Sequence, residues 1–229
     1  MKKIVWLAII SLFTLNYATA ATKPDSSDAI AKPATSTVNV TASNCDKGTP
    51  CYVIKTSAST LSQAVNQNVS EKQAYAMIQN SIIPQIDFTL VTRLAMGNSW
   101  KTATSDQQTQ IINLFKQMLV FSYSSALSKL KGAQVSIINS KIVGDKQNRA
   151  TVNSTMAMPN NGDSNNQPIN IEYDLAKIDS NWKIYDVKIE NASIVTTYRS
   201  QFNDTVQKDG IPGLIKQLQA KVDSMAVDK

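Results

Sequence analysis

The sequence predicts an α+β fold in which helices cover one face of a curved antiparallel sheet of about four strands. Residues 52–130 carry apolar side chains at helical spacing, whereas residues 135–189 contain four runs in which apolar and polar side chains alternate. After the fourth run the spacing returns to that of a helix. Because short turn sequences separate the strand runs, we expect a meander of sequential strands.

The chain begins with the features of a secretory signal peptide. Lys2 and Lys3 precede an apolar run from Ile4 to Leu15, and the small residues Ala18 and Ala20 follow. We therefore expect residues 1–20 to be removed and the mature protein to be soluble and periplasmic. The apolar run is shorter than the roughly 20 residues that a membrane-spanning helix needs.

Residues 21–51 predict a flexible leader that ends in a disulfide loop. The first part is rich in Ala, Thr, Ser, Pro and Lys and has few large apolar side chains to bury. Cys45 and Cys51 then flank Gly48 and Pro50. In an exported chain such a pair favours a structural disulfide, while the alternative of a redox-active pair lacks the C-x-x-C spacing.

The segment from Tyr52 to Met96 predicts a series of helices. Ser70 and Gln73 have the spacing of a capping box at a helix start. Pro84 predicts a kink or break. The following helical piece should stop near Gly97, since glycine readily adopts the left-handed conformation at a helix end.

The longest helix should begin at Thr104 or Ser105, each of which has a glutamine three positions later, and run to about Leu130. Its apolar face is broad rather than a narrow stripe. We therefore expect this helix to be buried on more than one side or to line a cavity.

Four strands should follow and lead into two closing helices. The strand runs are Val135–Val143, Arg149–Met158, Ile169–Lys177 and Trp182–Ile189. The last strand passes directly into a helix that ends at Gly210, and a second helix starts with Pro212. Residues 52–226 thus predict a single α+β domain.

Composition excludes several kinds of function. The chain has no histidine, which removes the commonest general base and metal ligand, and two cysteines are too few for a zinc site. Lys and Arg exceed Asp and Glu by six, and by four without Lys2 and Lys3, yet no basic cluster of the nucleic-acid-binding kind is present. We expect no cofactor, no metal and no nucleic acid.

Two blocks of sequence resemble the MlaC family, the periplasmic phospholipid-binding proteins of the Mla pathway within the wider toluene-tolerance family. The blocks are residues 82–108, IIPQIDFTLVTRLAMGNSWKTATSDQQ, and residues 182–202, WKIYDVKIENASIVTTYRSQF. The resemblance implies an NTF2-like mixed fold with a deep apolar pocket. It also implies a monomeric, non-enzymatic shuttle that maintains outer-membrane lipid asymmetry.

The expected partners under this resemblance are a phospholipid, an inner-membrane MCE-domain ABC transporter complex and an outer-membrane MlaA-type lipoprotein complex. One departure is Asn191, where the family often has Gly; Asn tolerates the left-handed geometry of such a turn. Asp87 and Asp186, which are typical of the family, are interpreted as structural residues.

The resemblance implies that the pocket lining comes from the apolar faces of the helices and strands, although periodicity shows only that a face is buried and an ordinary core is the commoner role for any one of these residues. Arg93 and Arg199 are candidates for steering a phosphate head group. The lining candidates are Phe115, Leu119, Tyr123, Val152, Met156, Met158, Tyr173, Leu175, Val187, Ile194, Tyr198 and Phe202.

Two other functions fit the same pattern. One is a small NTF2-like isomerase or hydratase that uses Asp186 with Tyr185 or Tyr198 in an apolar pocket. Strand alternation predicts that Tyr185 and Asp186 point to opposite faces, so that only one could enter the pocket. The other is a carrier of a different apolar ligand, such as a hopanoid or a sterol.

Overall fold

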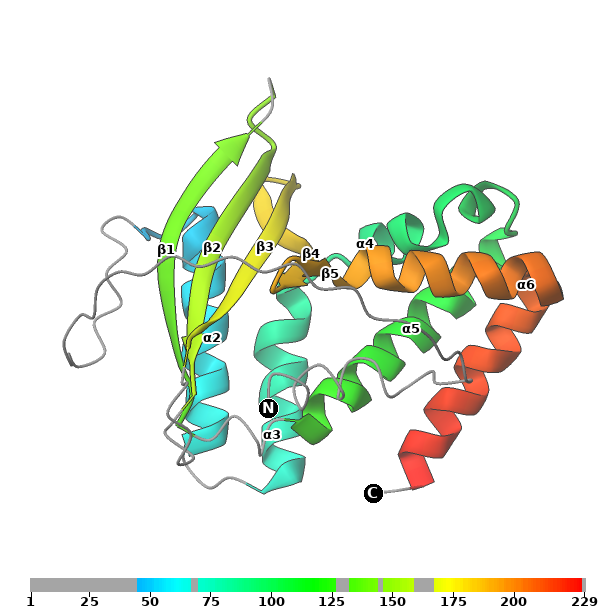
Figure 1. Cartoon of the computed structure of the whole chain (residues 1–229), viewed down its shortest axis with the longest axis horizontal. Coiled ribbons are helices and arrows are strands. Elements are labelled where there is room, and N and C mark those ends of the chain that lie inside the picture. The colour runs from blue at the N-terminus through cyan, green and yellow to red at the C-terminus, as the bar shows by residue number, and fades with distance from the viewer. Residues whose placement is uncertain (1–44, 67–69, 127–131, 144–145, 159–166, 228–229) are drawn as a thin grey trace, which may run out of the picture. The chain divides into compact units, whose positions relative to one another are not determined.

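The computed structural model describes residues 45–66, 70–126, 132–143, 146–158 and 167–227, all within a compact unit of residues 38–229 (Figure 1). The signal peptide, most of the leader and the end predicted for the longest helix, residues 127–130, lie outside the described residues. In the described part of the chain, no helix is long and apolar enough to span a membrane. The helical elements are α2 (Pro50–Asn66), α3 (Glu71–Met77), a π-helical turn (Ile78–Ile82), a 3-10 turn (Ile83–Gln85), α4 (Phe88–Met96), a 3-10 turn (Gly97–Lys101), α5 (Ser105–Ala126) and α6 (Ile194–Val227).

The sheet is an antiparallel meander whose strands lie side by side in chain order. Its members are β1 (Gln134–Val143), β2 (Arg149–Ala157), β3 (Ile169–Ile178), β4 (Asn181–Ile189) and β5 (Ala192–Ser193). The four long strands agree with the predicted runs to within one residue at each end. The fifth strand was not predicted, because two residues are too few to show a period.

The predicted helix starts are confirmed by their capping hydrogen bonds. The Ser70 N–H donates to Gln73 Oε1 at 3.0 Å, and the Gln73 N–H donates to Ser70 Oγ at 3.3 Å. Thr104 and Gln107 make the same pair of bonds at 3.0 and 3.2 Å, which fixes the start of α5. The predicted break at Pro84 is also present, since Pro84 lies in the 3-10 turn after α3.

The sheet has one apolar face, here called the inner face. Val152, Tyr173 and Val187 lie next to one another on β2, β3 and β4 and belong to this face. Helix α2 lies behind the sheet in Figure 1, and its Ile54 packs against Val152 and Leu175 in one buried cluster. Strand alternation thus directs apolar side chains to the covered side of the sheet.

The predicted disulfide between Cys45 and Cys51 is present. Both residues are buried, with exposed fractions of 6% and 4%, and they belong to the same apolar cluster as Ile54. Because Cys51 is the second residue of α2, the disulfide holds the start of this helix against the inner face.

The two sequence blocks that resemble the MlaC family meet at the edge of β4. Ile86 forms a parallel bridge with Ile184, and the Asp87 N–H donates to the Ile184 carbonyl at 2.9 Å. The Asp87 side chain accepts a hydrogen bond from the Leu90 N–H at 2.9 Å and so caps α4. The structural role predicted for Asp87 is therefore confirmed.

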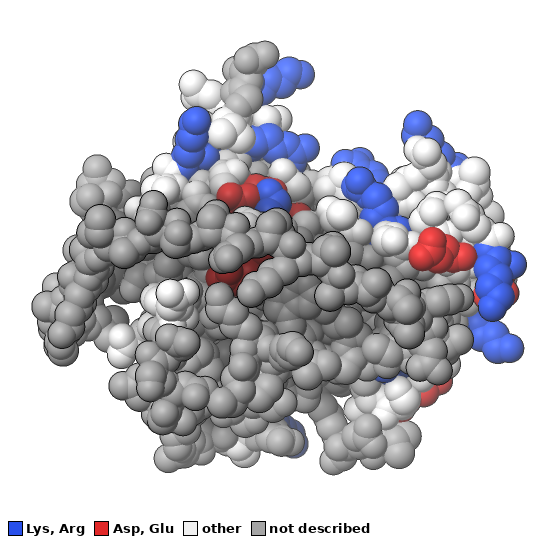
Figure 2. All heavy atoms as spheres, viewed as in Figure 1, with Lys and Arg blue, Asp and Glu red and all other residues white. Residues whose placement is uncertain are grey.

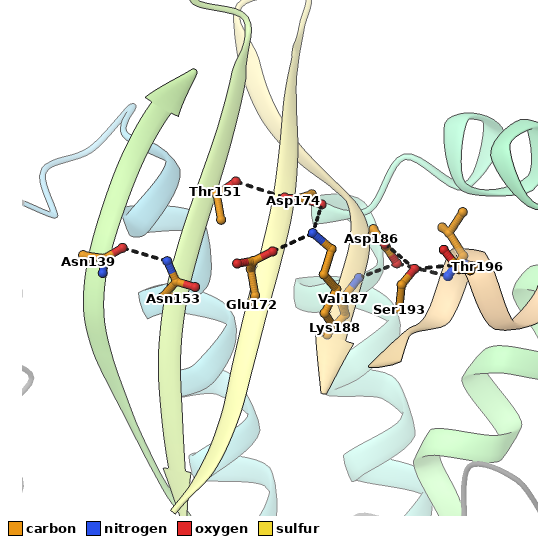
Figure 3. Close-up of polar contacts among 11 residues, drawn as sticks. Asn139, Thr151, Asn153, Glu172, Asp174, Asp186, Val187, Lys188, Ser193 and Thr196 are labelled. Carbon is orange, nitrogen blue, oxygen red and sulfur yellow. Dashed lines mark hydrogen bonds and ion pairs between the residues drawn. The ribbon is translucent and has the colours of Figure 1, made fainter. Parts of the chain in front are cut away.

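Asp186 holds β4 and the start of α6 together (Figure 3). Its Oδ1 accepts hydrogen bonds from the Val187 N–H at 2.9 Å and the Val195 N–H at 3.0 Å, and its Oδ2 accepts one from Ser193 Oγ at 2.6 Å. Asn191 in the intervening turn has φ of 67°, as expected for a residue that replaces Gly. The structural role predicted for Asp186 is confirmed.

Helices α4, α5 and α6 form a second buried cluster, here called the helical cluster. Helix α6 bends at Gly210, whose φ of 70° and ψ of −179° are not helical, and Pro212 follows the bend. Both halves pack in this cluster, since it contains Phe202 from the first half and Leu218 from the second. The two predicted closing helices are thus the two halves of α6.

Replacement of Cys45 and Cys51 together by Ala should lower the free energy of unfolding by about 2 kcal/mol, because the closed loop restricts the unfolded chain. Alanine avoids the burial of two hydroxyl groups at positions that are almost fully covered. Urea denaturation monitored by circular dichroism measures the change, and reductant should have no further effect on the variant. A variant as stable as the oxidised parent would show that the disulfide does not stabilise this fold.

Candidate functional site

The face of the sheet opposite the inner face is polar (Figure 3). Lys188 on β4 pairs with Glu172 Oε1 at 2.5 Å and with Asp174 Oδ2 at 2.9 Å, both on β3. Thr151 Oγ1 donates to Asp174 Oδ1 at 3.0 Å. The hydrogen bonds that Lys188 donates to Glu172 and Asp174 raise the pKa of its ammonium group. Such a charged surface suits water rather than an apolar ligand.

A β-bulge changes the expected positions of Tyr185 and Asp186. Asp174 pairs with Asp186 and Leu175 pairs with Ile184, so Tyr185 is an extra residue in β4. The Arg149 guanidinium carbon lies 5.1 Å from the centroid of the Tyr185 ring. The alternation predicted for Tyr185 and Asp186 is therefore wrong, because the bulge interrupts the period of two between them.

Both members of the pair proposed for an enzyme make contacts within the protein. Burial and the negative charge of Asp174 raise the pKa of Tyr185. Asp186 receives three hydrogen bonds from the strand-to-helix junction, where its role is structural. In the described residues, no three His, Cys, Asp or Glu side chains form a group that could hold a metal ion.

The inner face has two parts along the strands. At the end near the disulfide, Val152 and Leu175 are fully buried beneath α2. Toward the other end the face continues with Met156 and Ile171, which are buried, and with the partly exposed Val187. The second part keeps apolar surface that the described protein atoms do not fully cover.

Tyr173 stands in the middle of the inner face and combines two properties. The residue as a whole is partly buried, and burial raises the pKa of its phenol, with a hydrogen bond to Ser154 as the opposing cause. Ser154 has an exposed fraction of 2% and also donates to the Ile171 carbonyl at 3.4 Å.

The structure divides the predicted lining residues into two groups. The sheet group lies on the inner face and contains Val152, Met156, Tyr173, Leu175 and Val187, with the partly exposed Met158 directly after β2. The helical group lies in the helical cluster and contains Phe115, Leu119, Ile194, Tyr198 and Phe202. The Tyr123 side chain lies outside the described residues.

The aromatic residues of the helical group contact one another. The Phe115 ring lies 4.8 Å from Tyr198 and 5.0 Å from Phe202 between centroids, both edge-on. Burial raises the pKa of Tyr198 to about 12. These rings join α5 to α6, and their contact with a ligand stays a prediction.

The two candidate head-group arginines are exposed on neighbouring helices. Arg199 Nε on α6 donates to the Leu94 carbonyl of α4 at 2.7 Å, so Arg199 also connects these helices. Arg93 lies in the last turn of α4. A role of either in head-group binding stays a prediction.

Ser154 was not among the residues predicted for the site. The sequence nevertheless indicates it, because Ser154 is a polar residue between Val152 and Met156, at a position that strand alternation directs to the inner face. A buried hydroxyl in an apolar face requires a hydrogen-bond partner, and Tyr173 and the Ile171 carbonyl provide partners.

Two comparisons relate the chain to known proteins. A family model described as MlaC protein matches residues 53–220. The chain is also similar to the solved structure of a phospholipid-binding protein from Ralstonia solanacearum in complex with a phospholipid. The sequences are 26% identical, the match covers 78% of this chain and 99% of that one, and the TM-score is 0.67. The chain thus belongs to the MlaC family.

Proposed function

We propose that this protein carries a phospholipid through the periplasm, with the acyl chains enclosed between the inner face of the sheet and the helices. The observation that carries the proposal is the likeness to a protein in complex with a phospholipid, which extends over nearly all of that protein. The apolar inner face of this chain offers a surface against which the acyl chains would lie.

The energetics require such enclosure. A diacyl phospholipid has roughly 30 methylenes, and at about 0.8 kcal/mol for each one the exposure of both chains to water would cost on the order of 20 kcal/mol. A carrier must therefore replace water along most of the chain length. The inner face supports this role with large apolar side chains on three adjacent strands, among which lie the Tyr173 and Ser154 hydroxyls.

Two features favour the periplasm as the place of action. The first residues have the pattern of a secretory signal peptide. The Cys45–Cys51 disulfide is typical of proteins in oxidising compartments. Under this proposal the partners are an outer-membrane lipoprotein complex of the MlaA type and an inner-membrane MCE-domain ABC transporter, between which the lipid passes without chemical change.

Native mass spectrometry of the protein purified from a bacterial periplasm tests the ligand directly. We expect a mass increase of one phospholipid, and extraction with solvent should yield phospholipid with mixed acyl chains. A sterol, a hopanoid or another defined ligand in its place would contradict the phospholipid assignment, as would a ligand-free mass after purification without detergent.

Replacement of Met156 by Trp should lower the phospholipid content, because a larger ring on the inner face takes the volume of the acyl chains. Thr155→Trp is the matched control, since Thr155 neighbours Met156 on β2 and points to the polar face. Overpacking of a core costs about 1–3 kcal/mol, so thermal unfolding must first establish that both variants are folded.

The lipid content per folded protein, measured by phosphate analysis, should fall at least severalfold for Met156→Trp and remain unchanged for Thr155→Trp. Equal lipid content in the two variants would remove this part of β2 from the binding surface.

A further inference from the structure

Strand β1 lies at the edge of the sheet. In the part of the chain that the structure describes, it pairs with β2 on one side and with no strand on the other, which we call its free edge. Residues 138–142 of β1 are all exposed, with Ile138 at 58% and Ile142 at 48%. A long edge strand with exposed apolar side chains and unpaired backbone groups is a template for the pairing of a further strand.

The regular part of this edge is residues 139–143. A β-bulge at Ile138 interrupts the pairing of β1 with β2, whereas the register continues without a shift from Asn139 to Val143. Ile142 pairs with Ala150, which points to the same side of β2 as Val152 of the inner face. The exposed Ile142 therefore lies on the inner side of the sheet, at its free edge.

The described chain begins close to this edge. Cys45, the first residue of the described ranges, is buried in the same cluster as Ile137 of β1 and Ala150 of β2. In Figure 1 the blue segment before α2 begins on the side of β1 away from β2. The chain that precedes Cys45 therefore joins the fold beside the free edge of β1.

The residues before Cys45 include a short run with the sequence pattern of a strand. Val38, Asn39, Val40 and Thr41 alternate between apolar and polar side chains, and three of the four are β-branched. The four residues that lead from this run to Cys45 span at most about 14 Å, so the run lies within reach of β1.

The charges at this edge favour an uncharged segment. Lys and Arg side chains gather at the upper end of the sheet in Figure 2, and Lys141 is the charged residue of β1. Residues 38–44 carry no charge. Because like charges on facing strands destabilise a sheet, a segment without cations suits the edge that carries Lys141.

We propose that residues 38–42 dock on the free edge of β1 beside residues 139–143 and extend the sheet by one strand. The backbone of this segment pairs with the N–H and C=O groups on the free edge of β1. Val38 and Val40 share one face of the segment and cover Ile142 on the inner side of the sheet. The disulfide holds Cys45 against α2, and this short tether gives the segment a high effective concentration at the edge.

This inference does not rest on the proposed lipid ligand. Residues 139–143 are separate from the predicted lining residues, which lie on β2, β3, β4 and the helices. The two proposals can therefore fail independently, and lipid content measured by native mass spectrometry should be the same in all variants of the segment.

Hydrogen–deuterium exchange of the protein purified from a bacterial periplasm, measured by mass spectrometry of peptides from β1, tests the docking. Val38→Pro with Val40→Pro removes two N–H donors and prevents a regular strand. Exchange of the amides in residues 139–143 should then become at least about tenfold faster, because the free edge of β1 loses its partner. Ala29→Pro with Ala31→Pro is the matched control and should leave the exchange of β1 unchanged. The interior strand β3 should exchange at the same rate in all three proteins.

Limited proteolysis with elastase, which cleaves after small aliphatic residues, provides a second measurement on the unaltered protein. Cleavage after Ala31 and Ala34 should precede cleavage after Val38 and Val40, because a backbone paired in a sheet is not accessible to a protease. Cleavage at the valines as early as at the alanines would overturn the proposal, as would β1 amides that exchange equally fast in the parent and in the proline variant. Protection of β1 that survives the prolines and depends on protein concentration would also overturn it and assign the edge to a second copy of the chain.

Discussion

The one-sided character of the sheet is the constraint on which the other features depend. Alternation along β2, β3 and β4 places Val152, Tyr173 and Val187 on one side and Thr151, Asp174 and Lys188 on the other. The polar side can face water, but the apolar side must be covered by other parts of the protein or by a ligand. Helix α2, held at its start by the disulfide, covers the end with Val152 and Leu175, while apolar surface remains partly exposed farther along.

The helices α4 and α6 are attached to the sheet by polar contacts at β4. Asp186 binds the start of α6, Asp87 caps α4 beside Ile184, and Arg199 joins α6 to α4. The two sequence blocks that indicate the family therefore form a joint between sheet and helices. In a lipid carrier, such a joint would fix the distance between the apolar surfaces of the sheet and the helices. It would take no part in a reaction of the ligand.

The sequence predicted the four long strands and the capped helix starts closely, because alternation and capping boxes depend on neighbouring residues alone. The bulge at Tyr185 could not be predicted, since it depends on how β4 pairs with β3. Periodicity also does not separate a ring that packs against protein from one that packs against lipid. The pattern predicts a buried apolar position for both Phe115 and Tyr173, but Phe115 contacts other rings in the helical cluster, whereas Tyr173 lies on the inner face of the sheet beside Ser154.

The central claim is that acyl chains lie against the inner face of the sheet. Loading of the protein with a phospholipid that carries a photoreactive diazirine in one acyl chain, followed by irradiation and mass spectrometric mapping of the labelled residues, tests this claim most directly. The account predicts labels on Met156, Tyr173 and Val187, which share the inner face. Labels confined to the polar face, around Thr151 and Lys188, or to the interior of the helical cluster would contradict it.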